Sequence, residues 1–292
     1  MKAIVFGGSG FLGSHVADSL SENGYYVSIY DIRRSDYLTD NQNMIIGDIL
    51  DADSVKKAVA GCDIVYDYAG LASLDSASTR PVDSVMLNVV GTCNIMDACV
   101  ACGVKRFVYA SSFYANSEKG GFYRCSKQAA EIYIEEYNRK YGLDYTILRF
   151  GSLYGPRSDK GNGIRTMLLD AMNEGVVHYN GTGEETREYI HVKDAAGLSI
   201  RVLDDEFKNK NIVITGHDSY QVKDIVRIIG EILEKNVVGD YSNRSSELHY
   251  EFTPYTYKPK QNYKLVNDFY HDLGQGLIEC MEELAEHGEL EI

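Results

Sequence analysis

A glycine-rich segment near the N-terminus constrains the fold more than any other feature. The apolar run Ala3–Phe6 leads directly into GGSGFLG at 7–13, and a helical pattern follows. A strand, a glycine turn and a helix in this order point free backbone N–H groups and the positive helix end at an anion. The spacing is GxxGxxG, one residue longer than the common GxGxxG, but the flanking elements make it specific. We expect the pyrophosphate of a dinucleotide to contact Gly7, Gly10, Phe11, Leu12 and Gly13.

An acidic residue at the end of the second apolar run indicates which dinucleotide binds. Asp31 follows the glycine run by about twenty residues, where a carboxylate accepts hydrogen bonds from the adenosine ribose and repels a 2′-phosphate. NAD is therefore the expected cofactor. Arg33 and Arg34 come next and could bind that phosphate instead. NADP thus stays open as the alternative, and we count Arg33 among the cofactor contacts.

The remainder of the first half alternates short apolar runs with longer amphipathic segments. The runs suited to buried strands lie at 27–30, 44–46, 64–66, 107–110 and 145–148. Helical patterns separate them at 54–59, at 85–102 and from Tyr123 onward. This alternation predicts an α/β fold, a doubly wound parallel (Rossmann) sheet with crossover helices.

Beyond Arg149 the alternation loosens, and glycine and proline interrupt the chain at 155–156 and 161–163. We predict an NAD-binding Rossmann domain over 1–155 and a smaller, interleaved substrate-binding lobe over 156–189 and 217–292. Residues 190–216 are expected to return to the Rossmann domain, because a helix near 192–202 and a strand near 211–215 extend its pattern.

Composition excludes several partners. The net charge of −14 argues against nucleic acid and anionic membranes as partners, and no stretch approaches the roughly 18 apolar residues of a membrane span. The lone CxxC at 99–102 has no second pair, so we expect reduced cysteines in a cytoplasmic protein. We expect no metal, and interpret His15, His191 and His217 as structural, without the carboxylate and histidine neighbours that a metal requires.

A tyrosine and a lysine at helical spacing suggest catalysis. Tyr123 and Lys127 share one helix face, and the ammonium can lower the pKa of the phenol from about 10. Tyr123 then becomes a general base near neutral pH. A serine hydroxyl from the preceding strand end, Ser112 in preference to Ser111, could hold the oxygen that is deprotonated.

Several of these motifs occur in an order that resembles the extended short-chain dehydrogenase/reductase family, the NAD-dependent nucleotide-sugar epimerases and dehydratases. The resemblance covers nearly the whole chain and rests on 7–13, Asp31, Asp48-Ile49, 68–71, Asn88, Ser111-Ser112, Tyr123 with Lys127, and 148–157. It implies that Ser112, Tyr123 and Lys127 are catalytic.

The resemblance also assigns binding residues. Asp48 and Ile49 would contact adenine, and Asn88 would brace the site from behind. The further cofactor contacts that it implies are Tyr68, Ala69, Gly70, Leu71, Tyr123, Lys127 and Phe150. The nucleotide-sugar substrate would meet Ser112, Ser152 and Arg187, whose guanidinium suits a diphosphate.

Three departures from the family pattern bear on the reaction. Phe113-Tyr114 replace the Asp-Glu pair with which the family's 4,6-dehydratases eliminate water, which argues against that chemistry. Ser152 stands where many members have an asparagine. The C-terminal arginine and Leu-Gly-Trp signature are absent around 258–273, so neither the sugar nor the nucleotide is determined.

The leading hypothesis is an NAD-dependent nucleotide-sugar 4-epimerase that works through a 4-keto intermediate with Tyr123 as base. One alternative is a net C4 dehydrogenase or reductase of a UDP- or GDP-linked hexose or heptose. Another is a catalytically silent dinucleotide sensor. The resemblance further implies a role in polysaccharide biosynthesis and a homodimer or larger homo-oligomer, paired through the helices at 85–102 and 123–141.

Overall fold

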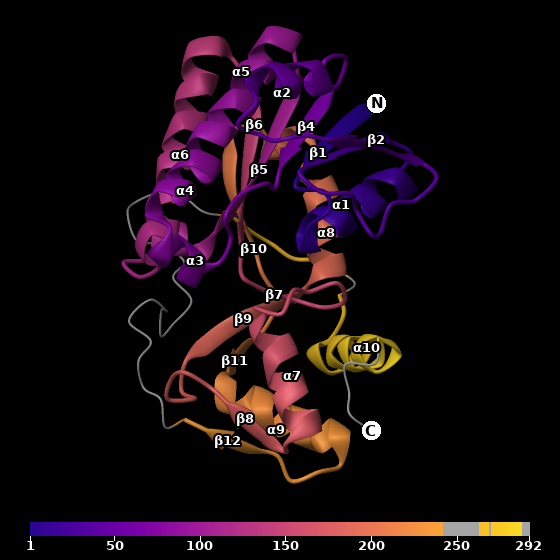
Figure 1. Cartoon of the computed structure of the whole chain (residues 1–292), viewed down its shortest axis with the longest axis vertical. Coiled ribbons are helices and arrows are strands. Elements are labelled where there is room, and N and C mark those ends of the chain that lie inside the picture. Colours follow the sequence, from indigo (N-terminus) through magenta and orange to yellow (C-terminus); the bar gives the residue numbers. More distant parts are fainter. Residues whose placement is uncertain (242–262, 269, 288–292) are drawn as a thin grey trace.

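A parallel sheet of eight strands forms the centre of the computed structural model, which describes residues 1–241, 263–268 and 270–287 (Figure 1). The strand order is β13-β10-β6-β5-β4-β1-β2-β3, and every adjacent pair runs parallel. The strands are β1 (Lys2–Phe6), β2 (Tyr26–Asp31), β3 (Gln42–Ile46), β4 (Ile64–Asp67), β5 (Arg106–Ser112), β6 (Tyr145–Phe150), β10 (Lys210–Ile214) and β13 (Tyr263–Leu265). The predicted doubly wound fold is confirmed.

Helices cover both faces of this sheet. Alternate residues of β1 show why, since Ala3 and Val5 belong to one buried cluster while Ile4 and Phe6 belong to the other. On one face lie α1 (Phe11–Glu22) and α8 (Val192–Arg201), and on the other α2 (Ala52–Val59), α5 (Thr92–Cys102) and α6 (Gly121–Tyr141). Strand order reverses between β1 and β4, which is where folds of this type bind ligands.

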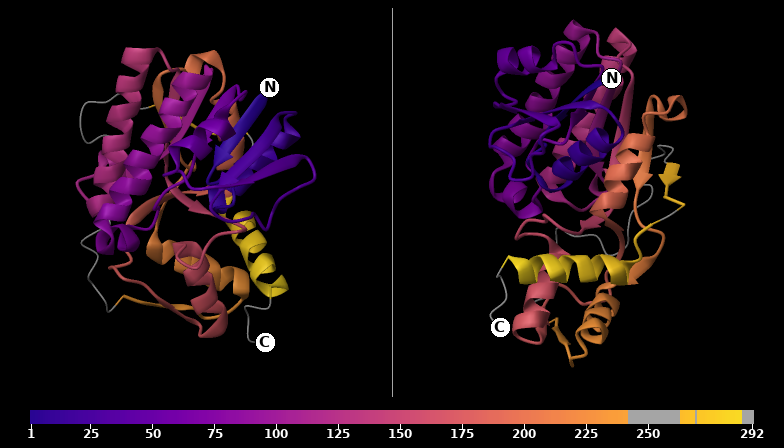
Figure 2. Two further views of the ribbon diagram at one scale, coloured as in Figure 1. Left: turned by 45° about the horizontal axis from the view of Figure 1, so that its top comes forward. Right: turned by 90° about the vertical axis from the view of Figure 1, so that its right-hand side faces the viewer.

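A smaller lobe lies beyond the carboxyl ends of the strands (Figures 1 and 2). It holds a three-stranded sheet, β11-β9-β7, and a two-stranded one, β12-β8. Its elements are β7 (Ser152–Tyr154), α7 (Gly163–Asn173), β8 (Val176–His178), β9 (Thr186–His191), β11 (Ser219–Gln221), α9 (Val222–Leu233), β12 (Val238–Asp240) and α10 (Leu273–Glu286). A third apolar cluster, separate from the two of the large sheet, joins α7, α9 and α10.

The chain passes between the two parts more than once. Helix α8 packs against α1, and β10 pairs with β6 in the large sheet. Strand β13 then pairs with β10, although we expected all of 217–292 to lie in the lobe. That expectation is wrong for β13, because a three-residue edge strand with only Leu265 buried leaves no readable alternation.

One helical segment is longer and more apolar than we expected from the sequence. Residues Pro81–Cys102 form a continuous helical run made of α4 (Pro81–Val85), a π-helical turn (Met86–Gly91) and α5. By length and composition this run could span a membrane, contrary to our expectation, while 44% of its most apolar window is buried inside the protein. Core helices of folded domains pass the same test, and α5 packs on α2 and α6.

Short helical elements complete the described chain. They are α3 (Leu74–Thr79) and two 3-10 turns, Phe113–Asn116 and Asp205–Phe207. The first 3-10 turn follows β5 directly and shapes the entrance to α6.

Candidate active site

The glycine run forms a turn that only glycine fits. Gly7 has φ of +76°, and a Cβ there would lie 2.6 Å from the backbone of Tyr68. A Cβ on Gly13 would collide with the carbonyl of Gly7. Gly10 is the N-cap residue of α1 and brings no side-chain cap, so the first turn presents bare backbone. This geometry is a cradle for an anion.

Two adjoining cavities open beside this turn, of about 310 Å³ and about 550 Å³. The predicted cofactor residues that line the first are Gly7, Gly10, Asp31, Arg33, Asp48, Ile49, Tyr68, Ala69 and Gly70. Those that line the second are Gly7, Gly10, Phe11, Leu12, Gly13, Arg33, Tyr68, Ala69, Gly70, Leu71, Tyr123, Lys127 and Phe150, and Ser112 joins them. The structure therefore brings the expected adenosine side and the expected catalytic side into one continuous lining.

Asp31 ties the glycine turn to the segment after β2. Its Oδ2 accepts a hydrogen bond of 3.0 Å from the backbone N–H of Ser9, and its Oδ1 one of 3.3 Å from that of Arg33. The carboxylate also lines the smaller cavity. A carboxylate at this place together with a backbone cradle fits an NAD adenosine diphosphate.

The catalytic candidates meet at the carboxyl end of β5. Nζ of Lys127 donates a 2.8 Å hydrogen bond to the carbonyl of Ala110 and lies 5.9 Å from the centre of the Tyr123 ring. Tyr123 and Lys127 are buried, while Ser112 is half-buried and its hydroxyl accepts from the N–H of Tyr114. All three border the larger cavity.

Ser111 has a different role from its neighbour. Its hydroxyl donates a 2.6 Å hydrogen bond to Oε1 of Glu131, which also forms a two-pronged ion pair with Arg149. Both charged side chains are almost fully buried, with an exposed fraction of 1% for Arg149 and 2% for Glu131. The hydroxyl of Ser111 is thus held by a buried ion pair, and both serines border the larger cavity.

A buried carboxylate beside Lys127 is a feature that the sequence reading missed. Asp67 ends β4, and burial raises its pKa to about 6, while its Oδ2 accepts a 2.8 Å hydrogen bond from Thr92. Burial lowers the pKa of Lys127 to about 8, and the charges of Asp67 and Glu131 oppose that shift. An acidic residue directly after the apolar run 64–66 was the signal available for it.

Asn88 lies behind the cavity wall and lines neither cavity. Its side chain accepts from the N–H of Leu71 at 2.7 Å and donates to the carbonyl of Leu71 and to Ser126. It sits in the π-helical turn. Asn88 therefore joins the loop after β4 to the helix that carries Tyr123 and Lys127, as a positioning residue.

The two residues expected to bind the diphosphate lie on the lobe. Ser152 begins β7 and Arg187 lies buried on β9, which pairs with β7. Neither lines the two cavities. Nη1 of Arg187 donates to the carbonyl of Thr186.

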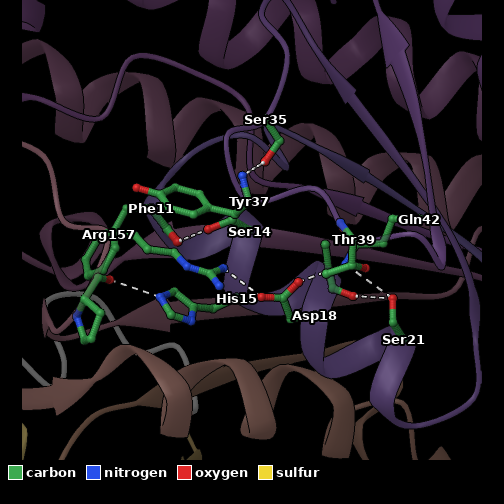
Figure 3. Close-up of polar contacts among 12 residues, drawn as sticks. Phe11, Ser14, His15, Asp18, Ser21, Ser35, Tyr37, Thr39, Gln42 and Arg157 are labelled. Carbon is green, nitrogen blue, oxygen red and sulfur yellow. Dashed lines mark hydrogen bonds and ion pairs between the residues drawn. The ribbon is translucent and has the colours of Figure 1, made fainter. Parts of the chain in front are cut away.

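Residues of the lobe and of the nucleotide side meet at the edge of the larger cavity, and Figure 3 shows the polar contacts between them. Arg157 pairs with Asp18 of α1 at 2.7 Å, and its guanidinium lies 4.4 Å from the centre of the Tyr37 ring. Nε2 of His15 lies 3.0 Å from the carbonyl of Pro156. Tyr37 and Arg157 both line the cavity. We call Tyr37 and Arg157 the rim clasp. The sequence analysis did not predict this contact.

Of the three histidines interpreted as structural, two have ordinary hydrogen bonds and the third does not. His15 meets Pro156, as above, and His217 lies 3.2 Å from the carbonyl of Asn267. His191, however, has Asp194 and His271 beside it, with one ligand atom from each within 4.8 Å of the others. The interpretation that it lacks such neighbours is wrong, because His271 lies 80 residues further along the chain.

A Rossmann sheet with a glycine turn at the carboxyl end of its first strand is typical of dinucleotide-binding enzymes. A family model described as the NAD dependent epimerase/dehydratase family matches residues 3–215. The chain belongs to this family of enzymes.

Relatives agree with that placement. A putative UDP-glucose 4-epimerase of Methanocaldococcus jannaschii is 31% identical over 252 residues, which cover 77% of this chain and 80% of the relative. Among solved structures, UDP-glucose 4-epimerase of Thermotoga maritima with UDP-glucose aligns at a TM-score of 0.82 and 25% identity, covering 98% and 99% of the two chains. UDP-glucuronic acid 4-epimerase of Bacillus cereus with NAD and UDP-glucuronic acid, 21% identical with a TM-score of 0.83, covers 98% of this chain and 100% of its own and shares the fold.

Proposed function

We propose that this protein is an NAD-dependent nucleotide-sugar 4-epimerase with Tyr123 as its general base. The observation that carries the proposal is the single lining that joins Ser112, Tyr123 and Lys127 to the glycine cradle. Similarity to proteins described as UDP-sugar 4-epimerases supports the substrate class and the reaction.

In the proposed reaction, the chain's own residues move and hold a proton. The Tyr123 oxygen takes the proton of the C4 hydroxyl, and the positive charge of Lys127 stabilises the phenolate that this requires. Ser112 donates a hydrogen bond to the sugar oxygen. NAD, when bound, supplies the hydride acceptor and later the donor. The C4 carbonyl turns within the pocket before reduction, which inverts that carbon.

The cofactor would be held by four groups of residues. The cradle at 7–13 holds the pyrophosphate, and Asp31 binds the adenosine ribose. Asp48 and Ile49 contact adenine, while the wall at 68–71 and Phe150 lie on the nicotinamide side. The rim clasp of Tyr37 and Arg157 lines the same cavity, and we propose that it slows release of the cofactor.

Dehydratase chemistry is disfavoured by two aromatic residues. Phe113 is buried, and the Tyr114 ring lies 6.1 Å from the Tyr123 ring in an edge-on contact. Neither offers the carboxyl acid and base that loss of water needs. The alternative that keeps the same residues is a net C4 dehydrogenase or reductase.

Substrate binding is proposed to span both parts of the molecule. Ser152 and Arg187 lie on two neighbouring, paired strands of the lobe sheet and would bind the diphosphate. Ser112 and Tyr123 would hold the sugar. We further propose that the protein is cytoplasmic.

We also propose a homodimer through the helical run Pro81–Cys102 and α6. Large apolar side chains are exposed along both: Val82, Val85, Met86, Val90, Phe122, Ile132, Tyr133 and Tyr141. Burying such side chains is the ordinary reason for helix pairing between subunits. Light scattering at micromolar concentration should give twice the chain mass, and a monomer would refute this part.

The experiment that tests the function first is release of the bound dinucleotide. Freshly purified protein is denatured, and the supernatant is analysed by mass spectrometry and absorbance. Near-stoichiometric NAD or NADH supports a self-recycling epimerase. An empty site that fills readily with added cofactor would favour the net dehydrogenase, and NADPH would overturn the assignment of Asp31.

A Tyr123→Phe variant tests the base. Loss of the phenol oxygen should lower kcat by about 10²–10⁴-fold, the usual contribution of a general base. The dinucleotide should still be released from the denatured variant. Undiminished biological activity would instead favour the catalytically silent sensor.

A further inference from the structure

A cluster of two imidazoles and two carboxylates lies at the junction between the lobe and the large sheet, apart from the proposed active site. His191 ends β9, and Asp194 lies in the first turn of α8. His271 precedes α10, and Glu279 lies on that helix. The imidazole rings of His191 and His271 are 4.6 Å apart, centre to centre.

His191 is the unusual member of the cluster. Its side chain is fully buried, and neither ring nitrogen makes a hydrogen bond within the part of the chain that the structure describes. Buried polar groups of folded proteins nearly always have a partner, so such a ring suggests a ligand.

The two carboxylates face different sides of the two rings. Glu279 lies on the Nε2 side, with its Oε2 3.5 Å from Nε2 of His191 and its Oε1 3.9 Å from Nε2 of His271. Asp194 lies on the other side of His271, where its Oδ1 is 2.8 Å from Nδ1. Asp194 therefore meets His271 at Nδ1, while Glu279 lies on the Nε2 side of both rings.

A small cavity of about 30 Å³ borders this cluster and is lined in part by His191, Asp194 and His271. A cavity of this volume has room for a water molecule, and so for a single ion. One ligand atom from each of the three residues lies within 4.8 Å of the others.

We propose that His191, Asp194 and His271 form a site for one divalent transition-metal ion of the zinc class. Two imidazoles and a carboxylate are a ligand set that zinc prefers, with a fourth position left for water. With the ion bound, Glu279 would move closer to the two Nε2 atoms than the 3.5 Å and 3.9 Å of the structure and accept their protons, a role that carboxylates often fill around metal-bound histidines. Ligand atoms about 2.0–2.2 Å from a tetrahedral ion lie about 3.3–3.6 Å apart, so Asp194 and Nδ1 of His271 would separate by about 0.5 Å.

The position of the site indicates what the ion does. It joins the end of β9 and the start of α8 to the segment before α10, and α10 packs on β9. The ion would therefore fasten the C-terminal helix to the strand that carries Arg187. The site does not depend on the proposed sugar chemistry, since no residue of the proposed catalytic set takes part.

The test uses the full chain, stripped with a chelator and titrated with Zn²⁺ and with Co²⁺. We expect saturable binding of one ion per chain, an absorption band of four-coordinate Co²⁺, and a rise in Tm with added Zn²⁺. His271→Gln should weaken Zn²⁺ binding at least tenfold, as should Asp194→Asn, and Glu279→Gln by about tenfold. His271 is partly exposed and outside regular elements, so its variant should keep the wild-type circular dichroism.

The matched control is His178→Gln, which removes another histidine that lies between carboxylates, Glu174 and Asp240, but on an exposed surface. It should leave Zn²⁺ affinity unchanged. Absence of saturable binding in the wild type would overturn the proposal. So would binding that survives in His271→Gln, or binding that disappears in His178→Gln.

Discussion

The two walls of the candidate active site are built by opposite means. At the proposed cofactor wall, from Gly7 to Gly13, glycines leave no room for side chains, so the backbone would be free to approach a phosphate. The catalytic wall at β5 and α6 works because charged groups are buried, with Glu131 and Arg149 almost fully enclosed and Lys127 beside them. The first wall should fail when atoms are added, and the second when a charge is removed.

The largest effect is expected on the cofactor wall. Gly13→Ala would place a Cβ on the carbonyl of Gly7, so the turn must shift away from the phosphate position. We expect NAD affinity to fall by more than about 100-fold, the loss of roughly two good charge-assisted hydrogen bonds. Calorimetric titration of the stripped protein measures it.

A glycine elsewhere serves as the control for that change. A Cβ on Gly163, at the start of α7, would meet no atom within 4 Å. Gly163→Ala should leave NAD affinity and stability nearly unchanged. Equal losses of NAD affinity in the two variants would mean that glycine is not required at position 13 of the cradle.

On the catalytic wall, Glu131→Gln should destabilise the fold. The change leaves Arg149 buried without its full negative partner, and such losses cost about 3–5 kcal/mol. Urea unfolding at neutral pH gives the free energy of unfolding. The control is Glu136→Gln, whose pair with Arg139 is exposed and should contribute under about 1 kcal/mol. Similar losses in the free energy of unfolding for the two variants would contradict the expected difference between a buried and an exposed ion pair.

A smaller effect is expected on the pH profile. Asp67 raises the pKa of Lys127 against the effect of burial, so Asp67→Asn should let that pKa fall below about 8. The high-pH limb of kcat/KM, where the ammonium deprotonates, should then move to lower pH. Rates measured from neutral to alkaline pH show the shift. A limb that stays in place would mean that Asp67 does not raise the pKa of Lys127.

The smallest effect concerns the rim clasp. Arg157→Gln breaks the partly exposed pair with Asp18 and the stacking on Tyr37, contacts worth about 1 kcal/mol together. NAD should dissociate about fivefold faster, as followed by exchange with labelled cofactor. Arg139→Gln, on the exposed face of α6, should leave the rate unchanged.

The parts that the sequence predicted are those whose chemistry is local. The glycine run, Asp31, and the pair Tyr123 and Lys127 each lie within one strand, turn or helix, so spacing alone reveals them. The doubly wound parallel fold could be anticipated because apolar runs that alternate with helical segments allow few arrangements.

The parts that it did not predict depend on contacts between distant segments. Arg157 meets Asp18 across 139 residues, and His271 meets Asp194 across 77. Asp67 looks like a loop residue until burial beside Lys127 is seen. No local period encodes which buried polar groups will meet, because packing of the folded elements decides it.

The proposed 4-epimerase reaction is tested most directly by measuring the configuration of C4 in a sugar nucleotide that has been incubated with the purified protein. UDP-hexoses and UDP-hexuronic acids are incubated without added cofactor, and the products are followed by NMR. We expect that one of them interconverts with its C4 epimer, that no NADH accumulates, and that Tyr123→Phe slows the exchange by about 10²–10⁴-fold. A released ketone with stoichiometric NADH, or no reaction while NAD is bound, would contradict it.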